Sequence, residues 1–295
     1  MQQAIMEPHH HTAVITGATS GIGNAFATEL AKKGFDLIIT GRRKEELLKV
    51  ANALSSGCGV RVKTFVGDLA DPLNRLALCQ MIQQAGEIEV LINNAGFGID
   101  RPFHGNSIDE IRSMISTHIL ATSELTHIVL PGMMNRRKGT IINVSSLGTF
   151  TPGLTRSMYL STKSFVHYFT VSLFMEVRSF GIKVQSLCPG LTRSDFHRDL
   201  QNEEMEKKFR LLKFMTPEEV VFQSLKALKK DRVLCIPGAV NKLLFIIAKC
   251  LPSRILMRIA KFRNKEHNRS FPGFSVPGLL YYPMNAKKVS NSLPV

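Results

Sequence analysis

The sequence lacks the features that mark secreted, metal-binding and membrane-spanning proteins. Its five cysteines are widely spaced and form no CxxC pair, so neither a disulfide framework nor a zinc site is indicated. We therefore expect reduced thiols, no bound metal and a cytoplasmic location. Residues 1–11 contain no basic segment followed by a long apolar run, and we expect a flexible leader rather than a signal peptide. The apolar run 243–251 is too short for a transmembrane helix and is interrupted by Lys249.

Acidic residues are scarce relative to basic ones, with 23 Asp and Glu against 38 Lys and Arg, for a net charge of +15. Such an excess favours an anionic partner: nucleic acid, a membrane surface or a phosphate-bearing cofactor. Residues 241–269 hold eight Lys or Arg and one acid, Glu266, and so carry +7 of the total. No basic motif interleaved with aromatic residues accompanies this charge, so we expect no nucleic-acid partner.

Short apolar, β-branched runs alternate with helical patterns from residue 12 to about residue 240. The predicted strands are AVIT (13–16), DLIIT (36–40), RVKTFV (61–66), VLIN (90–93), TIINV (140–144), KVQSL (183–187) and RVLCI (232–236). Nearly continuous apolar strands of this kind are buried on both faces of a parallel sheet. We predict an α/β fold with a doubly wound parallel sheet of about seven strands over 12–240, followed by a basic, apolar helical extension and irregular tail over 241–295.

A glycine-rich segment, TGATSGIG (16–23), follows the first predicted strand and opens the first predicted helix. Glycine lets the backbone turn sharply and approach a pyrophosphate, which the helix N-terminus then attracts; a purely structural turn is the alternative. The second predicted strand ends in Arg42 and Arg43, where an NAD-binding fold carries an acid. Two guanidinium groups suit a 2′-phosphate, so we predict NADP(H) over NAD(H), unless they are plain surface arginines.

Six motifs in order make residues 12–240 resemble the short-chain dehydrogenase/reductase family. They are TGATSGIG (16–23), GD (67–68), NNAG (93–96), NVSS (143–146), YLSTK (159–163) and CPG (188–190). The resemblance implies a Rossmann fold, a nicotinamide cofactor, a small-molecule carbonyl or alcohol substrate and association into homo-oligomers. Residues 117–196 resemble the branch of very-long-chain 3-oxoacyl-CoA reductases and 17β-hydroxysteroid dehydrogenases, and also bacterial reductases with unassigned substrates.

The resemblance implies a role for each matching residue. Ser146 would orient the substrate oxygen, Tyr159 would be the catalytic acid/base, and Lys163 would be its partner and a ribose ligand. Asp68 would contact the adenine, and Ser194 the carboxamide. The positions implied to bind the cofactor are Gly17, Ser20, Gly21, Ile22, Gly23, Asp68, Asn93, Ala95, Gly96, Tyr159, Lys163, Pro189, Gly190 and Ser194.

The spacing of Tyr159 and Lys163 also carries a chemical argument. Residues four apart share one face of a helix. A free tyrosine has a pKa of about 10, and a nearby ammonium group together with an oxidised nicotinamide ring would lower it. Tyr159 would then exchange a proton with a substrate oxygen while the cofactor exchanges hydride with carbon. Ser146 ends the fifth predicted strand, where its hydroxyl would stabilise a developing alkoxide.

His118 departs from the family pattern. It lies in the apolar helical stretch MISTHILATSEL (114–125), where the family usually carries an Asn that holds a water beside the Lys. His118 substitutes for that Asn in catalysis, or is a satisfied core residue, or weakens the site. The last reading supports the alternative function, an NADP(H)-binding regulatory or membrane-associated protein with weak turnover.

Two segments bear on the substrate and on localisation. The predicted lid, about 191–215, carries apolar residues that favour a hydrophobic, acyl- or steroid-like substrate, or that merely pack the lid onto the core: Phe196, Phe209, Leu211, Leu212 and Phe214. In 241–269, Arg254, Arg258 and Lys261 form one helical stripe and Ile255, Ile259 and Phe262 another. Such a helix suits an anionic membrane surface, or it covers the substrate pocket with its basic face in solvent.

Overall fold

The computed structural model describes residues 11–151, 156–193, 214–252 and 254–258. Seven strands form one sheet: β1 (Thr12–Ile15), β2 (Asp36–Gly41), β3 (Val62–Val66), β4 (Ile88–Asn93), β5 (Gly139–Val144), β6 (Ile182–Leu187) and β7 (Leu234–Cys235). Every neighbouring pair is parallel, in the order β3-β2-β1-β4-β5-β6-β7. The doubly wound parallel sheet predicted from the sequence is confirmed. Since the strand order reverses between β1 and β4, the carboxyl ends of these strands form the crevice in which such folds bind ligands.

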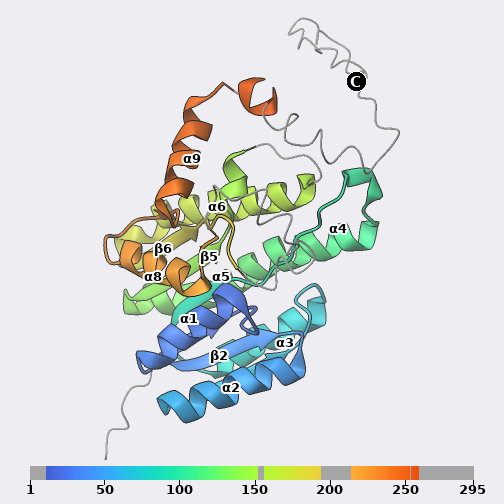
Figure 1. The fold of residues 1–295 in the computed structure, drawn as a ribbon. Helices are drawn as coiled ribbons and strands as arrows, with labels where there is room; N and C mark the ends of the chain where they lie inside the picture. The colour runs from blue at the N-terminus through green and yellow to red at the C-terminus, as the bar shows by residue number, and fades with distance from the viewer. Residues whose placement is uncertain (1–10, 152–155, 194–213, 253, 259–295) are drawn as a thin grey trace, which may run out of the picture.

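Helices cover both faces of the sheet (Figure 1). They are α1 (Gly21–Lys32), α2 (Lys44–Cys58), α3 (Pro72–Gln84), α4 (Ile108–Ile115), α5 (Ala121–Arg136), α6 (Ser157–Val177), α8 (Pro217–Leu228) and α9 (Ala239–Cys250), with short 3-10 turns at η1 (Phe103–Gly105), η3 (Leu147–Phe150) and η4 (Arg178–Phe180). The core on one face includes residues of α1, α2 and α8, and the core on the other includes residues of α3, α5 and α6.

The two cores follow from the two-residue period of a strand. Val14 and Ile38 pack on one face of the sheet, whereas Ile15 and Ile39 pack on the other, and all four are buried. Successive strand side chains point to opposite faces, so a strand that is covered on both sides needs an apolar residue at every position. This is why the strands appear in the sequence as unbroken apolar runs.

The segment that carries His118 is not one regular α-helix. Between α4 and α5 lies a π-helical turn, η2 (Ser116–Leu120), with His118 at its centre. A π-helical turn closes an i→i+5 hydrogen bond inside an α-helix and is frequent at functional sites. The π turn gives His118 its position in the helix, and the His118 side chain is buried there at 1% exposure.

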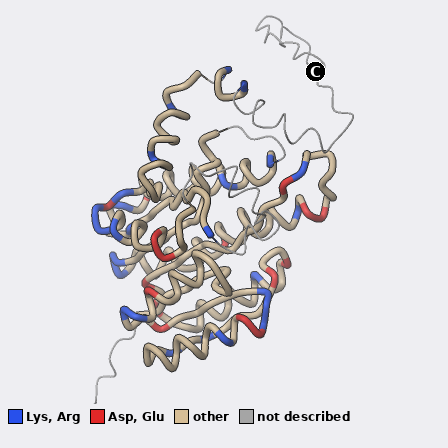
Figure 2. The backbone as a smooth tube through the Cα atoms, viewed as in Figure 1, with Lys and Arg blue, Asp and Glu red and all other residues tan. Residues whose placement is uncertain are grey.

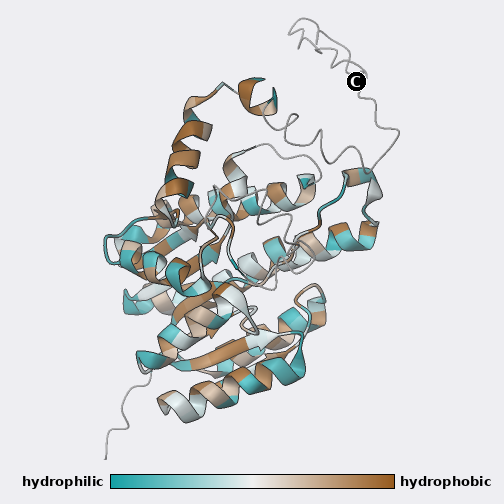
Figure 3. Cartoon of the chain, viewed as in Figure 1, coloured by the Kyte–Doolittle hydropathy of each residue, from teal (hydrophilic) through white to brown (hydrophobic). Residues whose placement is uncertain are grey.

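Helix α9 stands apart from the layers that flank the sheet (Figure 1). Its chain carries basic but no acidic side chains (Figure 2), and it is one of the most apolar helices of the molecule (Figure 3). No helix within the described residues is long and apolar enough to cross a membrane. The predictions for Ser194, for most of the lid and for the tail beyond residue 258 concern residues outside the described ranges.

Candidate active site

The glycine-rich loop after β1 is a close-packed turn that only glycine permits. Gly17 and Gly21 have φ values of +68° and +58°. A Cβ atom on Gly23 would lie 2.2 Å from the carbonyl oxygen of Gly17. The Asn94 side-chain amide donates hydrogen bonds to the carbonyl oxygens of Thr16, at 2.9 Å, and Gly17, at 3.1 Å. The loop therefore leads into the N-terminus of α1 with its backbone held open, which fits the phosphates of a dinucleotide.

Arg42 and Arg43 take different positions although they are adjacent. The Arg43 guanidinium donates to the hydroxyl oxygens of Thr19, at 3.0 Å, and Ser20, at 3.2 Å. Arg42 lies 3.5 Å from the Asp68 carboxylate, and its side chain is 64% exposed. Both arginines thus border the glycine-rich loop, but Arg43 is bonded to the loop itself whereas Arg42 projects into solvent.

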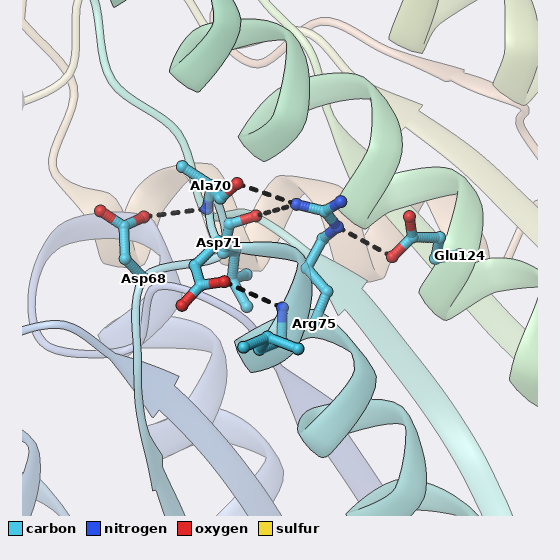
Figure 4. Close-up of polar contacts among 7 residues, drawn as sticks. Asp68, Ala70, Asp71, Arg75 and Glu124 are labelled. Carbon is cyan, nitrogen blue, oxygen red and sulfur yellow. Dashed lines mark hydrogen bonds and ion pairs between the residues drawn. The ribbon is translucent and has the colours of Figure 1, made fainter. Parts of the chain in front are cut away.

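Asp68, the residue expected to contact adenine, lies in a loop that a buried arginine holds in place (Figure 4). Arg75 of α3 donates to the carbonyl oxygens of Leu69 and Ala70, each at 3.0 Å, and its Nε lies 2.9 Å from Glu124 of α5. The Asp68 carboxylate in turn accepts from the backbone N–H of Ala70 at 2.9 Å. Arg75 therefore positions Asp68 through the backbone of the loop.

The NNAG motif (93–96) contributes one residue to the core and another to the site. The Asn93 side chain is buried and donates to Asn143, at 2.8 Å, and Thr126, at 3.2 Å. The Asn93 side-chain nitrogen is thus bonded within the core, whereas its buried Oδ1 has no hydrogen-bond partner among the described residues; a cofactor contact of Asn93 stays a prediction. Gly96 lies where a Cβ atom would come within 2.8 Å of the His118 ring and 3.3 Å of the Lys163 ammonium nitrogen. Glycine at this position lets both side chains approach the loop.

The structure brings Ser146, Tyr159 and Lys163 to the carboxyl end of β5. Ser146 follows the strand, and its hydroxyl accepts from the Gly148 N–H at 3.1 Å and lies near enough to the phenol of Tyr159, on α6, to act on its pKa. One turn further along α6, the Lys163 ammonium donates to the Val144 carbonyl oxygen at 2.8 Å. The Ser145 hydroxyl donates to the Lys163 carbonyl oxygen at 2.7 Å and fastens the helix to the strand. These three residues, from two separate motifs, form one site.

Burial dominates the ionisation of this site. Burial raises the pKa of the Tyr159 phenol, and the hydrogen bond with Ser146 and the charge of Arg156 only partly oppose the rise. The lowered pKa that we predicted depends on Lys163 together with an oxidised nicotinamide ring, and it stays a prediction for the cofactor complex; the cation that acts on the phenol here is Arg156. Burial lowers the pKa of Lys163 to about 8. The site therefore holds a protonated phenol beside an amine that titrates close to neutral pH.

His118 has protein partners on both ring nitrogens. The Phe97 backbone N–H donates to Nε2 at 3.1 Å, so the proton of the neutral ring is on Nδ1. Nδ1 lies 2.8 Å from the Thr162 hydroxyl oxygen, and this hydroxyl donates onward to the Tyr159 carbonyl oxygen. Burial, together with the Lys163 charge, holds the pKa of His118 well below its usual 6.5. His118 is therefore a neutral tether between the loop after β4 and the helix that carries Tyr159.

The CPG motif at the end of β6 is supported from the C-terminal helix. A Cβ atom on Gly190 would lie 2.5 Å from the Asn241 amide oxygen, and Asn241 is anchored by a 2.7 Å hydrogen bond to the Pro237 carbonyl oxygen. The Pro189 carbonyl oxygen accepts from the Leu147 N–H of η3. The loop that we expect beside the nicotinamide is thus held between η3 and α9.

Sequence reasoning missed Asn94, Arg75 and Asn241. Asn94 lies inside the NNAG motif (93–96), but the motif does not show that Asn94, rather than Asn93, contacts the glycine-rich loop. Arg75 carried a weak signal: it is a charged residue directly before the mainly apolar stretch LALCQMI (76–82) of α3. Asn241 carried none, because its partner Gly190 lies far away in the sequence.

The chain belongs to the short-chain dehydrogenase family, whose model matches residues 11–205. It is an NAD(P)-dependent oxidoreductase that acts on a carbonyl or alcohol group. A very-long-chain 3-oxoacyl-CoA reductase of Anas platyrhynchos is 32% identical over 265 residues, which are 88% of this chain and 81% of that protein. A hydroxysteroid dehydrogenase-like protein 1 of Gallus gallus is 37% identical over 187 residues, 63% of this chain and 56% of that protein.

A solved structure agrees with the family assignment. The short-chain dehydrogenase from Sphingobium yanoikuyae in complex with NADPH superposes with a TM-score of 0.72 at 26% identity. The match covers 92% of this chain and 99% of that chain. The family and fold expected from the six motifs are confirmed.

Proposed function

We propose that this chain is an NADP(H)-dependent reductase or dehydrogenase whose catalytic residues are Ser146, Tyr159 and Lys163. The observation that carries the proposal is the position of the three residues: Ser146 follows β5, Tyr159 and Lys163 lie one turn apart on α6, and Lys163 donates to the last residue of β5, at the sheet edge where the fold binds ligands. The glycine-rich loop fits the phosphates of the cofactor, which supplies or accepts the hydride when bound.

Each residue has a task that its environment supports. A raised pKa keeps the Tyr159 phenol protonated, so it donates its proton to a carbonyl oxygen during reduction. The Ser146 hydroxyl donates a hydrogen bond to the same oxygen as negative charge develops there. The charge of Arg156, which already acts on the phenol, stabilises the phenolate left on Tyr159. Lys163, with a pKa of about 8, exchanges its own proton near neutral pH.

Removing the hydroxyl of Tyr159 tests its role as the catalytic acid. We expect Tyr159→Phe to lower kcat for carbonyl-dependent NADPH oxidation by roughly 10²- to 10⁴-fold, the usual contribution of a positioned acid. NADPH binding, followed by nucleotide fluorescence, should stay within a few-fold of wild type. Tyr168→Phe is the matched control, since Tyr168 is an exposed tyrosine on the same helix. Near-normal turnover by Tyr159→Phe would refute the assigned role.

We also propose that the cofactor is NADP(H). Arg42 supports this, because its exposed guanidinium beside Asp68 is available to a 2′-phosphate. Arg42→Asp should raise KM for NADPH by about 10- to 100-fold, the loss of a charge-assisted contact, and should leave KM for NADH unchanged or lower. Arg112→Asp on α4 makes the same charge change on another exposed surface. Preference for NADH in the wild type, or an unaltered preference in Arg42→Asp, would contradict the proposal.

The substrate that we propose is a hydrophobic carbonyl or alcohol, acyl- or steroid-like. The names of the duck and chicken relatives support this class. A depression of about 580 Å³ lies between η3 and α6, next in sequence to the catalytic residues although none of them lines it. Its lining combines hydroxyl groups with two large apolar side chains: Thr149, Phe150, Thr151, Ser157, Leu160, Ser161 and Ser164. NADPH oxidation measured over acyl, steroid and small carbonyls would identify the substrate.

NADPH binding without turnover over that whole panel would favour the alternative, a cofactor-binding protein with weak activity. Only His118 argued for that alternative. The hydrogen bonds of His118 support a positioning role, which is compatible with an active site.

A further inference from the structure

Helix α9 exposes large apolar side chains along most of its length. The inward face carries Asn241, Phe245 and Ala248, at a spacing of four and then three residues. Asn241 and Ala248 are buried, and the Phe245 ring meets the Phe150 ring edge to face, with centroids 4.7 Å apart. The large apolar residues on the remaining surface are all exposed: Val240, Leu243, Leu244, Ile246 and Ile247. Leu243 is 57% exposed and Ile246 is 55% exposed. Ile255 and Met257 continue the exposed apolar surface beyond α9.

Cations accompany this apolar surface, and acids do not. Residues 237–258 contain four basic residues and no Asp or Glu: Lys242, Lys249, Arg254 and Arg258. The sequence alone left open a helix that covers the pocket and keeps a basic face in solvent. The structure shows that α9 does contact the site, through Asn241 and Phe245, but that the face it leaves uncovered is mainly apolar.

We infer that α9 and the turn after it bind the surface of an anionic lipid bilayer. An amphipathic helix that is apolar on one side and basic at its margins lies in the bilayer interface, with apolar side chains at the acyl boundary and cations at lipid phosphates. A second copy of the chain fits this face less well. Two copies of α9 would bring their basic side chains together with no acid between them.

The inference goes beyond the proposed function and does not depend on turnover. Phe150 joins the two, since it packs against Phe245 of α9 and lines the depression beside Ser146. A bilayer bound to α9 lies next to that depression, on the route that a lipid-like substrate would take.

Vesicle co-sedimentation of the full chain tests the inference. We expect binding to vesicles of phosphatidylcholine with phosphatidylserine, weaker binding to phosphatidylcholine alone, and release by high salt. The double variant Leu243→Gln, Ile246→Gln should weaken binding by about tenfold or more, because it removes two apolar contacts with the acyl region. Leu73→Gln, Leu76→Gln is the matched control, since these are exposed leucines of α3.

A fluorophore on the exposed Cys250 gives a second measurement in the wild-type helix, with Cys58→Ser to remove the other accessible thiol. A blue shift on addition of anionic vesicles would support insertion. No sedimentation of wild type with anionic vesicles, or equal losses in both double variants, would overturn the inference. A third result would also overturn it: wild type does not bind vesicles, and the double variant Leu243→Gln, Ile246→Gln has a lower oligomer mass than wild type. The apolar face would then be a contact between subunits.

Discussion

At the scale of single residues, His118 shows how a side chain unusual for the family fits the site. The ring accepts from the loop after β4 and donates toward the carbonyl oxygen of Tyr159 through Thr162. A protonated ring could not accept from the Phe97 N–H, so the tether exists only in the neutral form. His118 is a positioning residue; to act as a proton relay instead, the ring would have to release one of these contacts.

Protonation should therefore act on stability. Below pH 6.5 the unfolded chain binds a proton at His118 that the folded chain does not, so the stability contributed by His118 is present above pH 6.5 and is lost as pH falls. The difference in unfolding free energy between wild type and His118→Asn should shrink by about 1.4 kcal/mol per pH unit below 6.5. Urea denaturation at pH 7.5 and 5.5 measures it.

His127→Asn, the same substitution at an exposed position on α5, is measured beside it as the matched control. If the gap between wild type and His118→Asn is the same at both pH values, the buried ring is not held neutral. In that case His118 regains its place as a candidate proton relay.

At the scale of elements, Arg75 joins α3, α5 and the loop after β3. It is 6% exposed, and three of its contacts are with groups outside its own helix: Leu69, Ala70 and Glu124. A buried cation is costly unless it is paired and hydrogen-bonded, and this one satisfies both conditions. The loop that carries Asp68 thus depends on a side chain that does not itself face the groove.

Replacing Arg75 by Met keeps its volume but removes the donors. We expect Arg75→Met to lower the unfolding free energy by about 2–4 kcal/mol, because two buried carbonyl oxygens lose their donors. It should also weaken NADPH binding several-fold, because the loop that carries Asp68 loses its support. Urea denaturation and nucleotide fluorescence measure the two effects. Arg112→Met, on exposed α4, should change stability by no more than about 0.5 kcal/mol. A comparably small loss in Arg75→Met would contradict the bracing role.

At the scale of the whole molecule, charge and apolar surface are both unevenly distributed. The basic, acid-free stretch 237–258 stands apart from the sheet, while ion pairs such as those of Arg75 and Arg61 are spread over the domain.

Helix α6 has its own exposed apolar stripe, with Phe165, Tyr168 and Met175. Association into homo-oligomers, expected from the family resemblance, stays a prediction, and this stripe is the surface we expect it to use.

The sheet and much of the site could be predicted from the sequence because both depend on patterns among residues that are close together in the chain. Strands show as apolar runs, and Tyr159 and Lys163 show as a pair at helical spacing. The bracing contacts join segments that are far apart: Asn94 bonds Thr16 over 78 positions, and Arg75 meets Glu124 over 49. No periodicity encodes such pairs. Nor does spacing reveal that Arg43 turns to the glycine-rich loop while its neighbour Arg42 does not.

The contact between Asn241 and Gly190 bears on where the polypeptide can be cut. A boundary at residue 240 looks natural in the sequence, since the basic apolar extension begins there. A protein shortened to 240 would lose the amide that fills the space under the CPG loop, together with Phe245, which backs Phe150. Deletions meant to improve solubility by removing the exposed face of α9 would thus also remove the support of the CPG loop. Point substitutions on the outer face separate the two effects.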